Sequence, residues 1–240
     1  MNILLDIGNT LQKIAVFNDD ESVYCQSFSK ITEKNLFSIL NQFPIKNSII
    51  SSVANLDVPI VNILNTNTKM FHYSHQTKLP LKILYKSPET LGLDRIANAV
   101  GAVALFPKKN LLAVQVGTCL VLDFVNEKSE YLGGSISPGI KMRFNALHEK
   151  TNKLPLLSNN NSSPNFLGTD TNSSLSNGVI NGICYEIEGF IKEYSAKFEN
   201  LIVLFTGGDA DYLQKFIKNT IFAAPNLVLK GLNEIIKYNE

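Results

Sequence analysis

A short pattern that occurs twice constrains the fold of this chain more than any other sequence feature. Residues 4–17 contain an apolar run, a turn at Gly8-Asn9 and a second apolar run, and residues 112–125 repeat this arrangement around Gly117-Thr118. An apolar run that stops at such a turn and then resumes predicts two strands joined by a tight connection. Each copy is followed by a helical pattern and another strand, which indicates two related α/β halves.

The boundary between these halves is predicted at Pro107-Lys108-Lys109-Asn110, where a helical pattern ends. We therefore expect an N-terminal half of residues 1–107 and a C-terminal half of residues 108–240. Further strands are expected near residues 22–28, 48–53, 131–139 and 201–205, and helices near residues 36–43, 94–106 and 171–198. The polar segment 153–172, rich in Asn and Ser, is expected to form a mobile loop and is a candidate lid.

Charge and cysteine content argue against several classes of protein. The chain has 22 Lys and Arg and 21 Asp and Glu, a net charge of +1, so a basic surface for nucleic acid is not expected. Its longest apolar stretch, residues 111–125, contains Gln, Gly, Thr and Asp and is too short to span a bilayer. The three cysteines lack metal-ligand spacing, and the start MNILLDIGNT lacks the basic region of a signal peptide. We therefore expect a cytoplasmic protein without membrane or nucleic-acid partners.

The first turn, Asp6-Ile7-Gly8-Asn9-Thr10, places a carboxylate at the end of a buried strand and a glycine shortly after it. Gly8 can adopt backbone angles that aim the following N–H groups and hydroxyls at an anion, and Asp6 could hold Mg²⁺ directly or through water. A plain hairpin explains the same residues, so this turn alone leaves both interpretations open.

A second candidate, Gly92-Leu93-Asp94-Arg95, lies at the start of the helix predicted near residues 94–106. Asp94 could be an N-cap with Arg95 in solvent, an arrangement that stabilises a helix by about 0.5–2 kcal/mol. Alternatively, Asp94 could accept the proton of a substrate hydroxyl during phosphoryl transfer, a reaction that depends mainly on positioning and charge neutralisation. Arg95 would then pair with a carboxylate or a phosphate.

The two turns and a later Gly207-Gly208 together resemble the plan of the actin–hexokinase superfamily. In that superfamily, one strand–turn–strand loop from each half cradles the phosphates of ATP. The chain contains neither GxxxxGK[ST] nor GxGxxG, which argues against Walker and Rossmann nucleotide sites. The resemblance therefore implies an α/β phosphotransferase with two ribonuclease-H-like halves, each a mixed sheet flanked by helices.

An ordered series of motifs makes the resemblance specific. The chain carries DIGNT, a Tyr and a Pro ahead of LGLDR, then VGT, YLGGSISPG, the T-x-x-S-x-x-x-G of residues 171–178, and TGGDA. In this order, and over essentially the whole chain, the motifs are similar to those of type III pantothenate kinase. The resemblance implies that a homodimer phosphorylates pantothenate with ATP to 4′-phosphopantothenate, the first step of coenzyme A synthesis.

The same resemblance implies roles for individual residues. Asp94 would accept the proton, and Asp6 would lie near Mg²⁺. The ATP-binding residues would be Asp6, Ile7, Gly8, Asn9, Thr10, Leu11, Gln12, Lys13 and Thr118. The pantothenate-binding residues would be Tyr85, Gly92, Leu93, Asp94, Arg95 and Thr171. Thr171 could also be an N-cap, which is compatible with contact to pantothenate.

Position 115 departs from the family pattern. The second loop of the family usually reads D-x-G-T, and its Asp serves a monovalent cation, K⁺ or NH₄⁺, whereas this chain has Gln115. A glutamine offers a carbonyl oxygen without a charge and is one methylene longer. We therefore predict weaker binding of the monovalent cation and, as a consequence, weaker activity.

Two other functions fit parts of the pattern. The same fold includes accessory proteins that influence transcription, and a weakened second loop would suit a regulator that binds ligand without turnover. The intact Asp6, Asp94 and Arg95 argue against this alternative, because drift would be expected to reach the proton acceptor too. The third alternative is a kinase of the superfamily that acts on another small alcohol, and only the resemblance around Tyr85 and Gly92–Arg95 argues for pantothenate.

Overall fold

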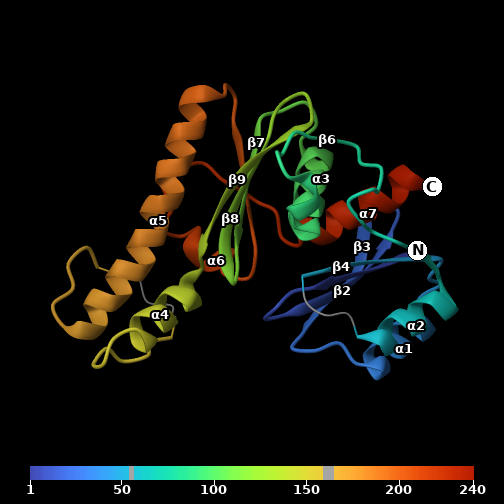
Figure 1. Cartoon of the computed structure of the whole chain (residues 1–240), viewed down its shortest axis with the longest axis horizontal. Coiled ribbons are helices and arrows are strands. Elements are labelled where there is room, and N and C mark those ends of the chain that lie inside the picture. Colours follow the sequence, from blue (N-terminus) through green and yellow to red (C-terminus); the bar gives the residue numbers. More distant parts are fainter. Residues whose placement is uncertain (54–56, 159–164) are drawn as a thin grey trace. The chain divides into compact units, whose positions relative to one another are not determined.

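The computed structural model describes residues 1–53, 57–158 and 165–240, and the chain divides into two compact units (Figure 1). Unit 1 contains Met1–Pro107, Ser129–Tyr131 and Asn226–Glu240, and unit 2 contains Lys108–Lys128 and Leu132–Pro225. Each unit is built on a mixed sheet flanked by helices, so the predicted α/β class is confirmed.

A five-stranded sheet forms the centre of unit 1, with the strand order β3-β2-β1-β4-β5. Its strands are β1 (Asn2–Ile7), β2 (Gln12–Asn18), β3 (Glu21–Phe28), β4 (Asn47–Ser52) and β5 (Lys69–Phe71). β1 and β2 form the antiparallel hairpin that the sequence predicted, and β4 runs parallel to β1 on its other side. Outside this sheet, the short strand β6 (Lys82–Ile83) pairs with Glu130 and Tyr131.

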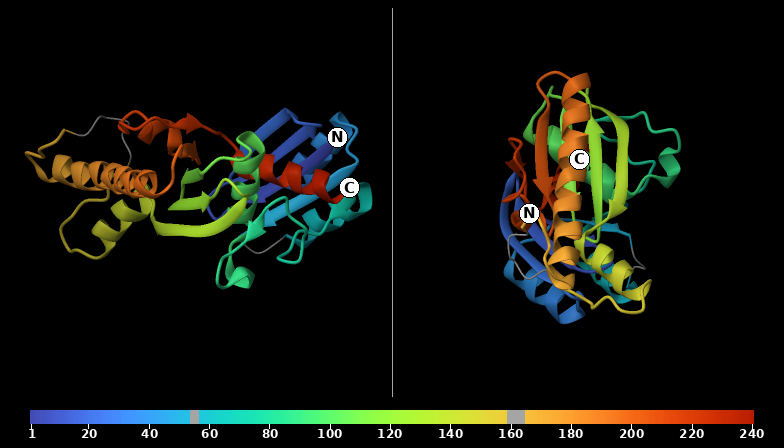
Figure 2. Two further views of the ribbon diagram at one scale, coloured as in Figure 1. Left: turned by 90° about the horizontal axis from the view of Figure 1, so that it is seen from above. Right: turned by 90° about the vertical axis from the view of Figure 1, so that its left-hand side faces the viewer.

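Helices cover both faces of this sheet. They are α1 (Glu33–Gln42), α2 (Val58–Asn67), α3 (Leu93–Leu105) and α7 (Leu227–Asn239), with the short 3₁₀ helix η1 (Pro88–Thr90) ahead of α3. α1 and α2 pack on Ile3, Leu5 and Ile7 of β1, while α3 and α7 pack against each other and against β4 (Figures 1 and 2). Because side chains alternate along a strand, Asp6 lies on the face of β1 that is turned toward α3 and α7.

Unit 2 repeats the strand order of unit 1. The second sheet has the order β11-β10-β7-β8-β9-β6, and its first five strands match the five of the first sheet; β7 and β8 form an antiparallel hairpin and β10 runs parallel to β7. The strands are β7 (Leu111–Val116), β8 (Cys119–Val125), β9 (Glu130–Pro138), β10 (Ile202–Thr206) and β11 (Phe222–Ala223). β7 and β8 therefore correspond to β1 and β2, as the repeated sequence pattern predicted.

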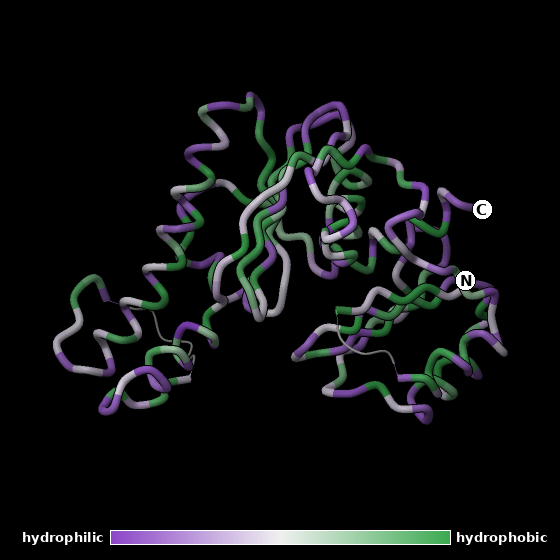
Figure 3. The backbone as a smooth tube through the Cα atoms, in the orientation of Figure 1, coloured by the Kyte–Doolittle hydropathy of each residue, from purple (hydrophilic) through white to green (hydrophobic). Residues whose placement is uncertain are grey.

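The helices of unit 2 are α4 (Ile140–Glu149), α5 (Thr171–Lys197) and α6 (Ala210–Leu213). α5 runs along the sheet and buries Val179, Ile183 and Ile187 against apolar side chains of β7 and β8 (Figure 2). In both units the apolar side chains are concentrated on the strands and the inner helix faces, and the polar ones on connecting turns (Figure 3). Within the described residues, none of the helices has the length and apolar character that a bilayer-spanning segment needs.

The predicted loop 153–172 is only partly described, because residues 159–164 lie outside the described ranges. The predicted helix start at residue 171 is confirmed, so the last two residues of the overlapping loop prediction, Thr171 and Asn172, belong to α5. The reason is local: Asp170 Oδ1 accepts the Ser173 N–H at 3.0 Å, while Ser173 Oγ accepts the Asp170 N–H at 3.1 Å. This reciprocal capping box starts the helix inside the segment that its composition assigned to a loop.

Two glycines allow the backbones of α3 and α7 to cross in contact. A Cβ added to Gly231 would lie 1.7 Å from the Ala97 carbonyl oxygen, and one added to Gly101 would lie 2.4 Å from the Leu227 carbonyl oxygen. Any larger residue would therefore push the helices apart, away from the face of the sheet that carries Asp6.

We expect Gly231→Ala to lower the free energy of unfolding by about 1–3 kcal/mol, because the added methyl group overpacks the crossing. Urea denaturation followed by circular dichroism measures the change. Gly189→Ala in α5 is the matched control, since its Cβ would meet nothing within 4 Å, and we expect it to be neutral or stabilising. Equal unfolding free energies for Gly231→Ala and the wild-type protein would contradict the close crossing.

Candidate active site

The turn between β1 and β2 is tight and exposes three of the predicted phosphate-binding residues. The Gly8 N–H donates to the Leu11 carbonyl oxygen at 3.2 Å, and a Cβ on Gly8 would lie 2.9 Å from the same oxygen. Asn9, Thr10 and Leu11 are exposed at the tip. Ile7 is buried among apolar side chains of unit 1, so only its main chain could reach a ligand.

Two other residues predicted to bind phosphate have partners in unit 1. Gln12 Oε1 accepts the Ile31 N–H at 2.7 Å, which ties β2 to the segment before α1. Lys13 Nζ donates to Asn226 Oδ1 at 2.9 Å, and Asn226 holds a left-handed backbone (φ 57°) at the start of α7. Gln12 therefore stabilises the hairpin, and Lys13 brings a positive charge beside its strand partner Asp6. The sequence carried no signal for the role of Asn226, because it lies far along the chain.

The charge of Asp94 acts on the carboxyl group of Asp6. Burial and the charge of Asp94 raise the pKa of Asp6 to about 6, while Lys13 opposes the shift. Burial also raises the pKa of Asp94, against the lowering effects of the Arg95 N–H and guanidinium. Two acidic groups that repel each other are stabilised by a proton or by a cation. The pair thus offers oxygen ligands that suit Mg²⁺ and a base stronger than an ordinary Asp.

The interpretation of Asp94 as an N-cap is wrong. Gly92 occupies the N-cap position of α3, Leu93 is the first helical residue and Asp94 the second. A Cβ on Gly92 would lie 2.5 Å from Asp94 Oδ1, so the carboxylate lies directly against the glycine. This close approach explains why a residue without a side chain precedes the predicted proton acceptor.

Tyrosines surround the start of α3. The Tyr73 hydroxyl donates to the Leu93 carbonyl oxygen at 2.8 Å, and burial together with the charge of Asp94 raises its pKa, so it remains a neutral phenol. Arg95 is only 7% exposed, and its guanidinium carbon lies 6.0 Å from the centre of the Tyr85 ring. The structure therefore brings Arg95 close to the Tyr85 ring, at the helix start that also carries Asp94. Tyr73 was missed, because a lone tyrosine in a polar segment has no distinctive spacing.

Two buried polar side chains border this group. Ser51 is the strand partner of Asp6 on β4, and Asn98 lies one helical turn after Asp94. Within the described parts of the chain, Ser51 Oγ and both polar atoms of the Asn98 amide are buried without a hydrogen-bond partner. Such atoms cost free energy unless water or a ligand bonds to them. Neither residue was predicted from the sequence, although the four-residue spacing of Asn98 from Asp94 was an available signal.

In unit 2, three glycine motifs of the sequence meet at the turn between β7 and β8. The Gly117 N–H donates to the Cys119 carbonyl oxygen at 3.0 Å, and Thr118 is exposed at the tip. A Cβ on Gly139 would lie 2.1 Å from the Gly117 carbonyl oxygen, and one on Gly207, whose φ is 102°, would lie 2.2 Å from the Val116 carbonyl oxygen. Only glycine allows these approaches, which hold the second predicted phosphate loop from two sides.

Gln115 stands in β7 opposite Val121 of β8 and Thr206 of β10. Its Oε1 atom is buried, and in the described residues it has no hydrogen-bond partner. A buried carbonyl-type oxygen can bind a cation, but it supplies no negative charge to offset the cation's lost hydration. Among all the residues that the structure describes, no three His, Cys, Asp or Glu side chains form a cluster that could hold a metal ion. A divalent ion bound at Asp6 would therefore need further ligands from phosphate and water.

Thr171 is the first residue of α5 and is exposed. Its interpretation as an N-cap is wrong, because Asp170 holds that position and bonds to Ser173. The Thr171 hydroxyl is thus not needed to start the helix. Unit 1 carries the predicted residues Asp6–Lys13, Tyr85 and Gly92–Arg95, and unit 2 carries Gln115, Thr118 and Thr171.

The amino-acid sequence of this chain is similar to those of one family of known proteins. The family model of type III pantothenate kinase matches residues 2–193. A type III pantothenate kinase from Christiangramia forsetii is 43% identical over 242 residues, which cover 100% of this chain and 99% of the relative.

Two solved structures show the same fold. A Campylobacter jejuni protein, provisionally assigned to the Baf family of transcriptional activators, matches with a TM-score of 0.61 at 23% identity over 99% of this chain and 98% of that one. A Sinorhizobium meliloti protein, provisionally assigned as a 2-dehydro-3-deoxygalactonokinase, matches with a TM-score of 0.55 at 12% identity over 100% and 99%. At these identities the two structures support the architecture alone.

Proposed function

The chain belongs to the type III pantothenate kinase family, and on this premise we propose that it phosphorylates pantothenate with ATP in the first step of coenzyme A synthesis. The observation that carries the proposal is the half-buried pair Asp6 and Asp94, with Asp94 against Gly92 and next to Arg95, at positions that match the family's motifs. No observation favours a regulator without turnover. The reaction is assigned to the cytoplasm, which the three free cysteines support.

In the proposed reaction, Asp94 accepts the proton of the primary hydroxyl of pantothenate as the hydroxyl oxygen attacks the γ-phosphorus of ATP in line. The bond to the β,γ-bridging oxygen breaks, ADP leaves, and Asp94 then holds the proton. The raised pKa of Asp94 supports this role, because it strengthens the base. Arg95, held close to Tyr85, would pair with the pantothenate carboxylate. Gly92 and Leu93 keep the Asp94 carboxylate at the mouth of α3, and Thr171 would complete the pantothenate site.

The phosphates of ATP would be held by Asp6–Lys13 and by Thr118, one loop from each of the halves 1–107 and 108–240. The matching strand orders of the two sheets support the assignment of one phosphate-binding loop to each half. Asp6 would bind Mg²⁺, which neutralises charge on the β- and γ-phosphates when bound. Asp6 fits that ion because it supplies oxygen ligands. The bound cation would also offset the repulsion between the negative charges of Asp6 and Asp94.

The test of this function is a coupled assay of ADP release. We expect turnover that requires both pantothenate and Mg²⁺·ATP. ADP release that is independent of pantothenate, with turnover on another small alcohol, would favour a different kinase of the superfamily. Folded protein that binds pantothenate but never releases ADP would favour the regulatory alternative.

We also propose that the monovalent-cation site is weakened by Gln115, whose neutral Oε1 is the buried oxygen at that position. Wild-type turnover is expected to change less than about twofold between Na⁺ and K⁺ or NH₄⁺. Gln115→Asp, which restores a buried charge for the cation, is expected to make turnover at least about fivefold higher in K⁺ than in Na⁺. The measurement is the coupled assay in each salt at constant ionic strength.

Gln76→Asp is the control for adding a carboxylate, because Gln76 is exposed in unit 1. It should leave the response to salt unchanged. If Gln115→Asp altered neither cation dependence nor turnover, the proposed effect of Gln115 would be wrong.

A homodimer is proposed as well. It is supported by exposed apolar side chains of unit 2, including Ile136 on β9 at 60% exposure and Tyr185 on α5 at 58%. Surfaces of this kind are commonly covered in assemblies. Light scattering after size exclusion should give twice the 26.6 kDa mass of the chain, and Ile136→Asp should shift it toward the monomer. A monomer mass for the wild-type protein at micromolar concentration would exclude the dimer.

A further inference from the structure

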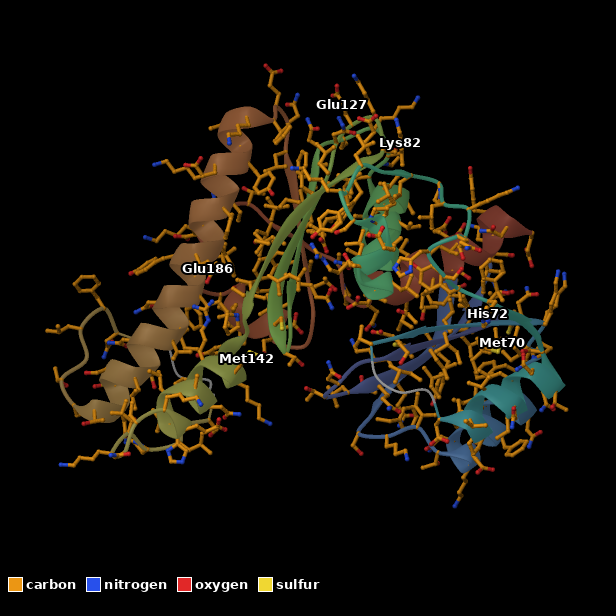
Figure 4. The ribbon with its side chains drawn as sticks, in the orientation of Figure 1. Met70, His72, Lys82, Glu127, Met142 and Glu186 are labelled. Carbon is orange, nitrogen blue, oxygen red and sulfur yellow. The ribbon has the colours of Figure 1, made fainter. Side chains whose placement is uncertain are left out.

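An ion pair with several hydrogen bonds joins three elements of unit 2 next to its phosphate loop. Arg143 on α4 donates through Nη2 to Glu186 on α5 and to Ser137 Oγ at 3.3 Å, and through Nε to the Pro138 carbonyl oxygen at 2.7 Å. Ser137 Oγ in turn donates to Glu186 Oε1 at 2.5 Å. The end of β9, the start of α4 and the middle of α5 are thus connected by charged side chains. Figure 4 labels Glu186 on α5 and Met142, the residue before Arg143, on α4.

The group held in this way is the turn Pro138-Gly139, which lies against the second phosphate loop. The Gly139 N–H donates to the Thr118 carbonyl oxygen at 3.1 Å. A Cβ on Gly139 would lie 2.1 Å from the Gly117 carbonyl oxygen and 2.7 Å from the Thr118 carbonyl oxygen. The backbone of this turn therefore forms part of the wall behind Gly117 and Thr118, and a shift of the turn would move the loop.

The chemistry of the pair suits a positioning role. Arg143 and Glu186 have side-chain exposures of 22% and 25%, so water screens their attraction less than at an open surface. The planar guanidinium reaches two side-chain acceptors and one carbonyl oxygen at once, which the single ammonium group of lysine would not reproduce. Ion pairs on open surfaces contribute little, but charge-assisted hydrogen bonds in a fixed geometry are stronger and directional.

We propose that Arg143 and Glu186 are positioning residues for ATP, which hold the Pro138-Gly139 turn and through it the Gly117-Thr118 loop in the geometry that receives phosphate. This inference rests on the proposed function. Neither side chain needs to touch the nucleotide. A rise of about 1.5 Å per helical residue puts Glu186 about 22 Å along α5 from Thr171, so the pair should not act on the proposed pantothenate contact.

The experiment compares Glu186→Gln, Arg143→Lys and the double variant in steady-state kinetics on the full chain. We expect each single variant to raise the KM for ATP about tenfold, with kcat changed less than about threefold and the KM for pantothenate unchanged. The double variant should be no worse than the poorer single variant, because both remove one coupled contact. Glu193→Gln is the matched control, since Glu193 is exposed on the same helix and should leave all three constants unchanged.

Amide hydrogen exchange supplies a measurement that does not depend on turnover. In Glu186→Gln, the Gly139 N–H should exchange faster than in the wild-type protein, while the Gly8 N–H of unit 1 should exchange at the wild-type rate. An unchanged KM for ATP in both single variants, or equal losses for ATP and pantothenate, would overturn the proposal. So would unchanged exchange at Gly139. If the wild-type protein released no ADP with pantothenate, the proposed function would fail, and the exchange rates alone would decide whether the pair holds the turn.

Discussion

Replacement of Asp94 by Asn is expected to lower kcat by about 10²–10⁴-fold, the usual contribution of a general base. Asn has almost the same shape as Asp but cannot take the proton of the attacking hydroxyl. Asp94 is half-buried with its carboxylate against Gly92, and burial raises its pKa, so an ordinary exposed carboxylate would not replace it as a base. The coupled assay measures the loss at saturating ATP and pantothenate, and calorimetric titration of pantothenate should give a dissociation constant close to that of the wild-type protein.

Asp57→Asn is the matched control for this substitution. Asp57 is an exposed carboxylate of unit 1 that pairs with Lys30 at 3.3 Å, a surface contact of small value. It should keep wild-type kcat. Turnover of Asp94→Asn within about tenfold of the wild-type value would show that Asp94 is not the proton acceptor.

The Asp6→Asn variant is expected to lose activity and to gain stability. Activity should fall by about 10²–10³-fold, because the phosphates and their metal ion lose a charged partner. The stability change follows from the pKa of Asp6, which burial and Asp94 raise from 3.8 to about 6 in the folded protein. A folded-state pKa above the unfolded value means that ionisation opposes folding, and this shift corresponds to about 3 kcal/mol at pH 8.

The stability that Asp6→Asn gains over the wild-type protein should increase as the pH rises. Below about pH 4, Asp6 is protonated in both states, so Asp6→Asn and the wild-type protein should be about equally stable. Between about pH 4 and pH 6 the wild-type protein loses stability relative to the variant, and above about pH 6 the difference is complete. Urea denaturation at pH 4, 5, 6 and 8, without nucleotide or metal, measures it.

Asp20→Asn provides a control of opposite direction. The hydrogen bond from Lys237 lowers the pKa of the exposed Asp20, so loss of its charge should reduce stability above about pH 4 rather than increase it. If Asp6→Asn were less stable than the wild-type protein at pH 8, ionisation of Asp6 would not oppose folding, and the proposed effect of burial and of the Asp94 charge would be wrong.

Local sequence patterns predicted much of this fold. The hairpins β1–β2 and β7–β8 followed from apolar runs interrupted by Gly8-Asn9 and Gly117-Thr118, because strand alternation and turn chemistry act over a few residues. The chemistry around Asp94 was predicted by a motif, since Gly92, Asp94 and Arg95 are neighbours in the chain. The structure places the Asp94 carboxylate against Gly92 and the Arg95 guanidinium near Tyr85, and the chemistry assigned to these residues stays a prediction.

Other features depend on contacts that local patterns do not encode. Asp94 and Thr171 were each a candidate N-cap, but Gly92 and Asp170 hold those positions, since a shift of one or two residues decides which group satisfies the first N–H groups. Ser51 lies beside Asp6 only through the register of β1 with β4.

The contact between Arg143 and Glu186 is non-local in the same way. It joins two helices through residues that lie 43 positions apart in the chain. Pairings of this kind appear only when the tertiary structure is known.

The discontinuity of unit 1 has a consequence for the order in which the protein matures on the ribosome. When synthesis reaches Pro225, every residue of unit 2 has been made, but α3 still lacks α7, the helix that packs on its glycine-containing face. The packing around Asp6 and Asp94 in unit 1 can therefore be completed only after α7 has left the exit tunnel. A chain that stopped at Pro225 would contain every residue of unit 2 but would lack α7, the helix that packs against α3.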